Sequence, residues 1–271
     1  MPQDLQQHEG EAPTVNLDTS RRSAHEILEE AGDNGRRELA RPAKALAFSG
    51  LAGGITMGLT GMSVAIAHAT LGYTGSLQKF IPYLFYPVGF IAVIIGRAQL
   101  FTENTLYPVV LIFSDRKQIL PTLRLWVIVF CTNVVGAALF AGLAVRTGAL
   151  SPEFVKELVT LGVDSSGGTM AHIFWTGVIG GWLIALVAWM VTASHWTIGQ
   201  IAVVWILTFI VGLGHFAHCI ATSGEILSAV FTGQVAIASY GHWLLFATLG
   251  NALGGVTFVT LLNFGQVKAE E

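Results

Sequence analysis

The stretch "GLGHFAHCIATSGEIL", residues 212–227, interrupts an apolar segment that would otherwise be one long transmembrane helix. It places two histidines, a threonine, a serine and a glutamate where a bilayer strongly disfavours polar groups. A second polar stretch, "RAQLFTENT" at 97–105, interrupts the apolar run 80–113 in the same way. Each interrupted run has about 34 residues, too many for one span and too few for two spans with a turn. We therefore predict two broken membrane spans.

The whole chain is too apolar for an ordinary water-soluble domain, with 53% hydrophobic and only 11% charged residues. Most acidic residues precede residue 40, so the formal net charge of −3 describes the N-terminal segment and not a binding surface. The composition predicts an all-α integral membrane protein without a nucleic-acid partner. We expect a polar, mobile cytoplasmic N-terminal tail at 1–43, a six-span membrane pore domain at 44–265 and a cytoplasmic C-terminus at 266–271. Within the tail, "SAHEILEEAG" is the one helical candidate.

Six apolar segments approach or exceed the roughly 20 residues that a membrane span requires. They lie at 45–70, 80–113, 121–146, 168–191, 199–232 and 241–264. The order is normal, broken, normal, and it repeats after about 120 residues. Because three is an odd number, the second set must enter the membrane from the opposite side. The pattern predicts a 3+3 inverted repeat with broken second and fifth spans, and paired broken spans of this kind indicate a transport site at the midplane.

Lysine and arginine residues predict the orientation of the chain. With the N-terminus inside, ten of the 14 face the cytoplasm, three face outward, and Arg97 lies within the membrane. We expect a multi-pass protein of the cell (inner) membrane with both termini in the cytoplasm.

Backbone that leaves a helix at membrane depth must face protein or a water-filled cavity, so the two breaks should meet. The half-helices that follow them would aim positive N-terminal ends into that cavity, which favours an anion. His218 is the main candidate, because a histidine near its titration point supplies a positive charge or a proton. A neutral His218 bonded to backbone in a packed bundle is the alternative. For His215, one helical turn earlier, packing is the better interpretation.

Arg97, Glu103 and Glu225 are the formal charges within the spans. A fixed cation at Arg97 would recruit anions, but an ion pair with Glu103 or Glu225 that braces the breaks is the simpler expectation. Leu100 and Phe101 are apolar residues in a polar stretch. They would form a hydrophobic constriction or take part in ordinary packing.

Metal and enzyme sites are weakly supported. His215 and His218 are spaced i, i+3, and Glu225 is nearby, but no well-placed third ligand shares their helix face. A rhomboid-type protease needs Gly-x-Ser-Gly, whereas "ATSG" at 221–224 begins with alanine. We expect no enzyme activity, no metal and no cofactor.

At the two breaks the sequence resembles the formate/nitrite transporter family. "AQLFTENT" at 98–105 is similar to that family's Leu-Phe-Thr loop, and "FAHCIAT" at 216–222 to its Phe-Glu-His-Ser-x-Ala-Asn stretch. "GGWLIALVAWM" at 180–190 is similar to its Cys-Asn-Trp-Leu-Val-Cys-Leu-Ala-Val-Trp signature. The resemblance covers about residues 44–265. It implies an aquaporin-like fold, a homopentamer with one pore in each protomer, and passage of small monovalent anions, often coupled to protons.

The leading hypothesis is therefore a channel or secondary transporter for small monovalent anions in the lipid bilayer. The resemblance places the family's constriction and flexible loop on Leu100, Phe101 and Thr102, and its central pore histidine on His218. In this hypothesis three groups of residues share the work: a path restricted by Leu100, Phe101 and Phe216, hydroxyl contacts from Thr102 and Thr222, and a charge or proton from His218.

Several family residues are replaced in this chain. Ala217, Thr222, Gly181 and Gln99 stand where the family has a glutamate, two asparagines and an acidic residue. No lysine occurs from 157 to 267, so the family's external pore-entry lysine is missing. One alternative is an aquaporin-like pore for small neutral molecules, and another is a sensor or scaffold that acts through its tail. The ion and the direction of transport stay open.

Overall fold

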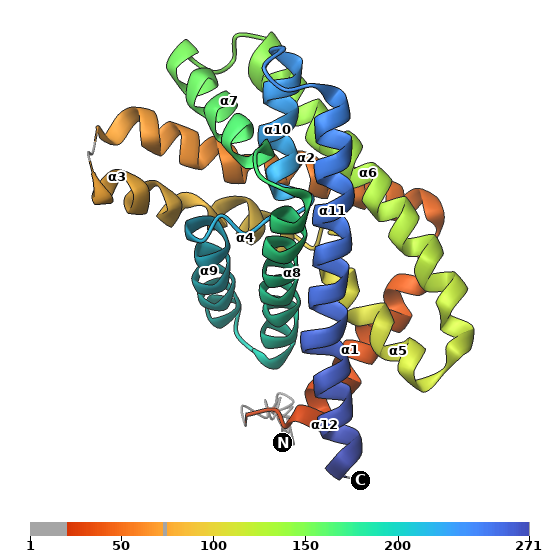
Figure 1. Ribbon diagram of the computed structural model, residues 1–271. Helices are drawn as coiled ribbons and strands as arrows, with labels where there is room; N and C mark the ends of the chain where they lie inside the picture. The colour runs from red at the N-terminus through yellow and green to blue at the C-terminus, as the bar shows by residue number, and fades with distance from the viewer. Residues whose placement is uncertain (1–20, 73–74, 271) are drawn as a thin grey trace, which may run out of the picture.

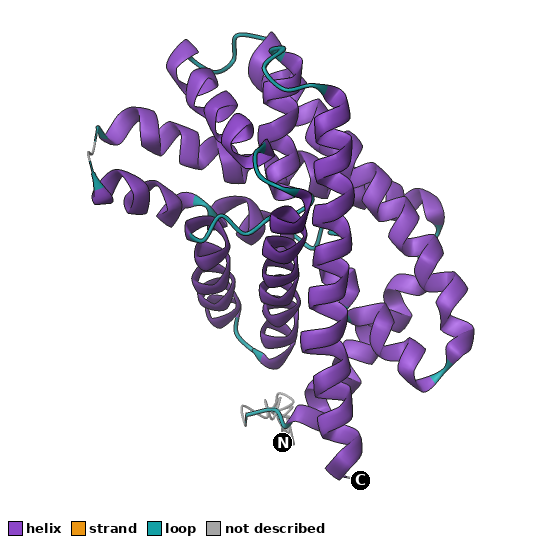
Figure 2. Cartoon of the chain, in the orientation of Figure 1, coloured by secondary structure: helices purple, strands orange, loops and turns teal. Residues whose placement is uncertain are grey.

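The computed structural model describes residues 21–72 and 75–270, and every regular element within these ranges is a helix (Figure 2). The all-helical class is thereby confirmed for the described residues. The main helices, labelled in Figure 1, are α1 (Ala24–Leu39), α2 (Ala43–Leu71), α4 (Pro87–Ile95), α5 (Tyr107–Ser114), α6 (Ile119–Arg146), α7 (Pro152–Ser166), α8 (Met170–Ala193), α9 (Thr197–Leu213), α10 (Ala221–Phe231), α11 (Ile237–Gly255) and α12 (Leu262–Glu270). The short elements are α3 (Ser76–Phe80), η1 (Ile81–Phe85), η2 (Glu103–Thr105), η3 (Arg116–Gln118) and the π-helical η4 (Val256–Leu261).

Four helical stretches are long and apolar enough to cross a membrane. They are Ala43–Leu71, Arg116–Arg146, Met170–Ala193 and Ile237–Glu270. Two shorter apolar helices, Ile81–Ile95 and Thr197–Leu213, each end at one of the polar stretches that the sequence analysis singles out. All six overlap the apolar segments predicted from the sequence. The chain turns sharply at Arg97 and His215, which have positive φ angles of 60° and 51° and lie 118 positions apart.

An asparagine in the middle of α6 holds the first break. The Asn133 side-chain oxygen accepts a hydrogen bond of 2.9 Å from the backbone N–H of Phe101. Its side-chain nitrogen donates to the carbonyls of Gly50 at 2.7 Å and Gln99 at 2.9 Å. Backbone groups released from a helix at membrane depth must find partners within the protein. Asn133 supplies two such partners, for Phe101 and Gln99, while its bond to Gly50 joins the break to α2.

Asn251 of α11 repeats this arrangement 118 positions later. Its oxygen accepts from the backbone N–H of Cys219 at 2.8 Å, and its nitrogen donates to the carbonyls of Gly177 and Ala217, both at 2.8 Å. The two breaks are therefore held by the same three bonds from the same residue type. The same side chain and the same set of bonds thus recur 118 positions apart.

Glycines allow the long helices to cross closely at these asparagines. A Cβ atom on Gly181 of α8 would collide with the backbone carbonyl oxygen of Asn251, and one on Gly54 of α2 would collide with that of Asn133. Small residues at helix crossings are typical of membrane proteins, in which van der Waals packing drives helix association.

Replacing Gly181 with alanine is expected to lower the free energy of unfolding by about 2–3 kcal/mol, because two backbones must separate. Gly142→Ala is the matched control. A Cβ there meets only Phe231 at an ordinary 3.7 Å, and alanine has the higher helix propensity, so stability should stay level or rise by about 1 kcal/mol. Denaturant titration of the purified protein in mixed micelles measures both. Equal stabilities of the two variants would contradict the tight crossing.

α7 is a helix that the sequence analysis did not predict. It buries Leu158, Val159 and Gly162, and it packs against α10 and α2. Its 15 residues reach about 22 Å, too short for a span. Its sequence therefore contains no apolar run of the length that predicts a membrane span.

α1 occupies part of the segment that the sequence analysis treats as a mobile tail. A capping box between Ser23 and Glu26 starts the helix, and Ile27, Leu28 and Ala31 are buried. The helix packs against α5, α8 and α12, and the described ends of the chain lie together at the foot of Figure 1. Residues 24–39 are therefore a packed part of the structure, while residues 1–20 lie outside the described ranges.

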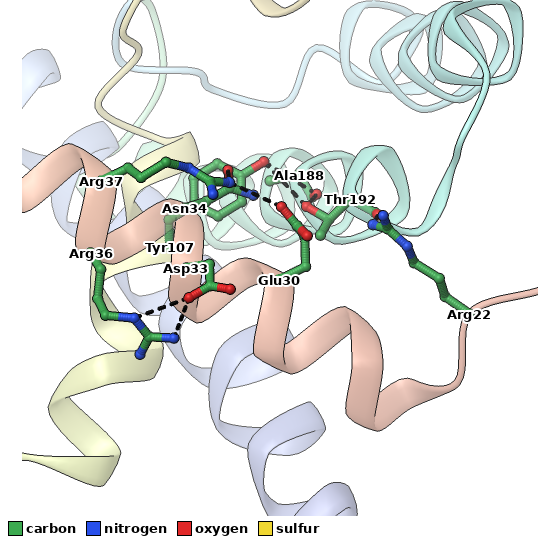
Figure 3. A network of polar contacts seen from close by, with 9 residues as sticks. All are labelled: Arg22, Glu30, Asp33, Asn34, Arg36, Arg37, Tyr107, Ala188 and Thr192. Atoms are coloured by element: carbon green, nitrogen blue, oxygen red, sulfur yellow. Dashed lines mark hydrogen bonds and ion pairs between the residues drawn. The ribbon is translucent and has the colours of Figure 1, made fainter. Parts of the chain in front are cut away.

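Polar contacts lie along the exposed side of α1 and just before its start (Figure 3). Arg37 donates to Glu30 at 3.0 Å and to Asn34 at 2.7 Å, both on the same helix. Arg22, just before the helix, donates to the carbonyl of Thr192 near the end of α8. The first described residues of the chain are thus tied to the end of a candidate membrane span.

Candidate functional site

The two breaks meet at a direct contact between Thr102 and His218. The Thr102 hydroxyl oxygen lies 2.9 Å from His218 Nε2, and both residues are 0% exposed. The Phe90 ring of α4 packs edge-on against the imidazole with a centroid distance of 5.1 Å. The structure therefore brings the main histidine candidate into contact with one of the two threonines for which the sequence analysis predicted hydroxyl contacts.

The hydrogen bonds of His218 define its protonation. Its Nδ1 atom accepts the backbone N–H of Ala221 at 3.0 Å, so Nδ1 carries a lone pair and no proton. The single ring proton of the neutral imidazole then lies on Nε2, which donates to Thr102. His218 is thus a neutral donor at the centre of the molecule. A second proton on Nδ1 would have to displace the Ala221 N–H.

The start of α10 differs from the sequence-based expectation of free N–H groups. The N–H of Cys219 is bonded to Asn251, that of Ala221 to the His218 ring, and that of Thr222 to the His218 carbonyl at 3.1 Å. These donors are satisfied within the chain, because a break buried in protein must complete its own backbone bonds. The helix dipole remains, but these three N–H groups are not open to an anion.

Two cavities lie on either side of the Thr102–His218 contact. The large cavity has a volume of about 380 Å³ and is bordered by η1, α7, α9, α10 and the first turns of α8. The small cavity has a volume of about 70 Å³ and is bordered by α1, the first break and the last turn of α8. Thr176 borders the large cavity and Val191 the small one. Fifteen residues of helix, about 22 Å, separate these two residues.

The cavities approach the central contact from opposite directions. Phe216, Ala217 and Thr222, which flank His218 in the sequence, line the large cavity. Gln99 and Glu103, which flank Thr102, line the small cavity. Because Thr102 and His218 are fully buried, the path between the cavities is closed where they touch.

The structure divides the charge network that the sequence analysis expected. Arg97 and Glu103 line the small cavity, whereas Glu225 and His215 line the large cavity. Within the described ranges, no ion pair joins Arg97 to either carboxylate. Of the two partners that the sequence analysis left open for Arg97, Glu103 lines the same cavity and Glu225 lines the other one. Glu225 instead accepts a hydrogen bond of 3.3 Å from Ser165 of α7.

The apolar candidates have different surroundings. Phe101 packs its ring against Trp126 and Phe130 of α6, with centroid distances of 5.4 Å and 5.3 Å, which matches the packing alternative. Leu100 is fully buried in the same hydrophobic cluster. Phe216 faces the large cavity, and Gly214 leaves room for its ring.

Asn133 and Asn251 are the residues of this site that the sequence analysis missed. Each is the one asparagine of its helix, α6 or α11, and the distance of 118 positions between them matches that between the positive-φ residues of the breaks. An intramembrane polar residue is a functional candidate by default, so this signal was available. In the described part of the chain, no three His, Cys, Asp or Glu side chains come together as a metal site.

Comparisons with known proteins agree with this architecture. Residues 25–265 match the family model described as "Formate/nitrite transporter". The chain is 32% identical over 246 residues to "Inner membrane protein YfdC" of Escherichia coli (strain K12), covering 89% of this chain and 78% of that protein. It is also 32% identical over 246 residues to "Probable formate transporter" of Methanothermobacter thermautotrophicus, covering 83% of this chain and 89% of that protein.

Two solved structures share the fold. An "FNT family ion channel" is 20% identical with a TM-score of 0.79, covering 90% of this chain and 99% of that chain. A "Pentameric formate channel with formate bound" is 18% identical with a TM-score of 0.69, covering 84% and 98%. Since the family model extends over most of the sequence, and two relatives are 32% identical to it, the chain belongs to the formate/nitrite transporter family.

Proposed function

We propose that the protein is a channel or secondary transporter that carries small monovalent anions of the formate and nitrite type across the inner membrane. The observation that carries the proposal is the buried Thr102–His218 contact between two cavities. The naming of a relative as a probable formate transporter supports the substrate class. Transport, and not catalysis, fits a site whose central polar groups are closed off from both sides.

We propose a six-span protomer built as a 3+3 inverted repeat, with both termini in the cytoplasm and five protomers in the assembly. The matched bonds of Asn133 and Asn251 support the repeat. The packing of α1 against α12 supports placing both described chain ends on one side. The likeness to the solved pentameric channel supports the pentamer. In this orientation the small cavity opens to the cytoplasm and the large cavity to the outside.

In the proposed passage, the solute enters between Thr102 and His218 and replaces each residue as the hydrogen-bond partner of the other. Separation of Thr102 from His218 exposes the Nε2–H and the hydroxyl as two donors for an anion in a region of low dielectric constant. An anion without such donors would meet a large desolvation penalty. Proton coupling would use the same ring in its doubly protonated form: the ring would first take up a proton on Nδ1, displacing the Ala221 N–H, and would then give its Nε2 proton to the solute and return to the neutral state.

Proteoliposome flux tests this function. The purified protein should raise the uptake of labelled formate and nitrite at least about tenfold over protein-free vesicles at slightly acid pH, since a bare bilayer presents the full desolvation barrier. Chloride and a neutral solute of similar size complete the panel. No increase for any solute, with the protein folded and correctly inserted, would overturn the proposal.

A pore for small neutral molecules is the second candidate. It is favoured by the neutral state of His218 and by the large cavity, where no described lysine or arginine is present. Uptake of the neutral solute alone, independent of membrane potential, would identify this function. Anion uptake that responds to membrane potential would exclude it.

A further inference from the structure

The large cavity has an unusual charge for the entrance of an anion path. Among its described lining residues are two carboxylates, Glu225 and Asp164, and no lysine or arginine. Arg97, the cation nearest to the breaks in the sequence, faces the small cavity instead. A solute that enters from the large cavity therefore meets a carboxylate before it reaches His218.

Glu225 is built into the wall of this cavity. Its residue exposure is 6%, and Ser165 is the hydrogen-bond donor that the structure gives to its carboxylate. Space for the side chain comes from Gly61 of α2, where a Cβ would lie 2.5 Å from Glu225 Cγ and 2.8 Å from Oε1. On α7, Gly162 lets the helix approach the Glu225 backbone. Two neighbouring helices thus make room for a buried carboxyl group at the cavity surface.

We propose that Glu225 is a specificity-determining residue that filters solutes by charge in the large cavity. Its carboxylate repels free anions. It accepts a hydrogen bond from solutes that carry their own proton, which are undissociated weak acids and small neutral donors. This inference rests on the proposed transport function. It goes further by stating whether the large cavity admits the ionised or the protonated form of the solute.

Other titratable groups share the cavity with Glu225 and contribute to its pH response. They are Asp164 of α7, His172 of α8, His215 of the second break, Tyr83 of η1 and the adjacent Tyr86. His68 of α2 contacts the Tyr83 ring at a centroid distance of 6.0 Å. The test therefore compares the variants with wild type at the same pH, so that the protonation of these other groups is the same in each protein.

Glu225→Gln tests the filter, because glutamine keeps the shape and an acceptor for Ser165 but removes the charge. Vesicles containing the variant should show about tenfold greater inward anion current at about pH 8, measured with nitrate and chloride, which remain ionised throughout the range. That factor corresponds to one unit charge roughly 10 Å away at an effective dielectric constant near 20. At about pH 4, near the ordinary pKa of a glutamate carboxyl, the gain should shrink, because protonation neutralises part of the wild-type carboxylate. Uptake of undissociated acid, measured with a weak acid at the same pH, should not rise.

Asp164→Asn is the matched control on the same cavity. This carboxylate is exposed, so solvent screens it and its removal should change the anion current about twofold or less. A Glu225→Gln current equal to that of wild type from about pH 5 to pH 9 would overturn the filter. Flux absent for every solute in wild type and both variants would instead contradict the proposed transport function. Circular dichroism and gel filtration verify that both variants fold and assemble.

Discussion

Replacing His218 with alanine is expected to lower formate flux by about ten- to 150-fold. The change removes the Nε2–H donor at the closed point of the path and leaves the buried Thr102 hydroxyl without its partner. A hydrogen bond to a charged group contributes about 1.5–3 kcal/mol, and 3 kcal/mol in the barrier corresponds to roughly 150-fold in rate. Initial uptake rates in proteoliposomes measure the effect, with the neutral solute as a check for leakage.

His218→Gln separates the donor from the proton carrier. Its side-chain N–H can replace the Nε2–H toward Thr102, but an amide does not take up a proton at physiological pH. Flux at neutral pH should stay within about tenfold of wild type, because the donor is kept, whereas any increase of flux at acid pH should be lost. Wild-type flux of His218→Ala at every pH, with the oligomer intact, would rule out a central role for this residue.

The length of the interrupted runs predicted the position of both breaks. α4 ends at Ile95 and α9 at Leu213, just before the polar stretches begin. Length was informative because a bilayer fixes the size of a span, and a run of about 34 residues fits neither one span nor two. The meeting of the breaks at His218 followed from the rule that irregular backbone at membrane depth must be surrounded by protein.

The direction of side chains at the breaks was not predictable in the same way. Arg97 and His215 adopt positive φ angles, which non-glycine residues rarely do, and each turns the chain sharply. The periodicity of a helix therefore does not predict in which direction the side chains on either side of such a turn point. The sequence analysis could not choose between Glu103 and Glu225 as the partner of Arg97 for this reason, since proximity to a break in the sequence does not show which cavity a side chain reaches.

Packing of the polar segments also escaped the sequence analysis. α1 is rich in charged residues, yet Ile27 and Leu28 lie on one face and are buried. Two adjacent apolar residues are too few to predict a buried helix face in a segment with nine acidic residues before position 40. In α7 polar residues are interspersed among the apolar ones, so the sequence contains no uninterrupted hydrophobic run there. The helix that lines one side of the large cavity was therefore not predicted.

Asn251→Ala is expected to lower the free energy of unfolding by about 2–5 kcal/mol. The substitution removes three hydrogen bonds of 2.8 Å each and leaves one N–H and two carbonyls of the chain without these partners. Three net contributions of about 1 kcal/mol give the middle of this range, and the weaker average for bonds between membrane helices sets its lower end. Asn133→Ala should cost a similar amount, because it removes the same set of bonds from the other break.

Asn263→Ala is the control for the loss of an asparagine as such. Asn263 lies in α12, half-buried, and makes one bond of 2.8 Å to the Val259 carbonyl, so its replacement should cost about 0.5–1 kcal/mol. Unfolding in mixed micelles gives the three free energies, and hydrogen exchange should show faster exchange at Cys219 in Asn251→Ala than in Asn263→Ala. Because the Cys219 N–H adjoins His218, Asn251→Ala should also impair transport in the fraction that still folds. If Asn251→Ala were no less stable than Asn263→Ala, the asparagines would not be what holds the breaks, and the position of His218 would need another source of support.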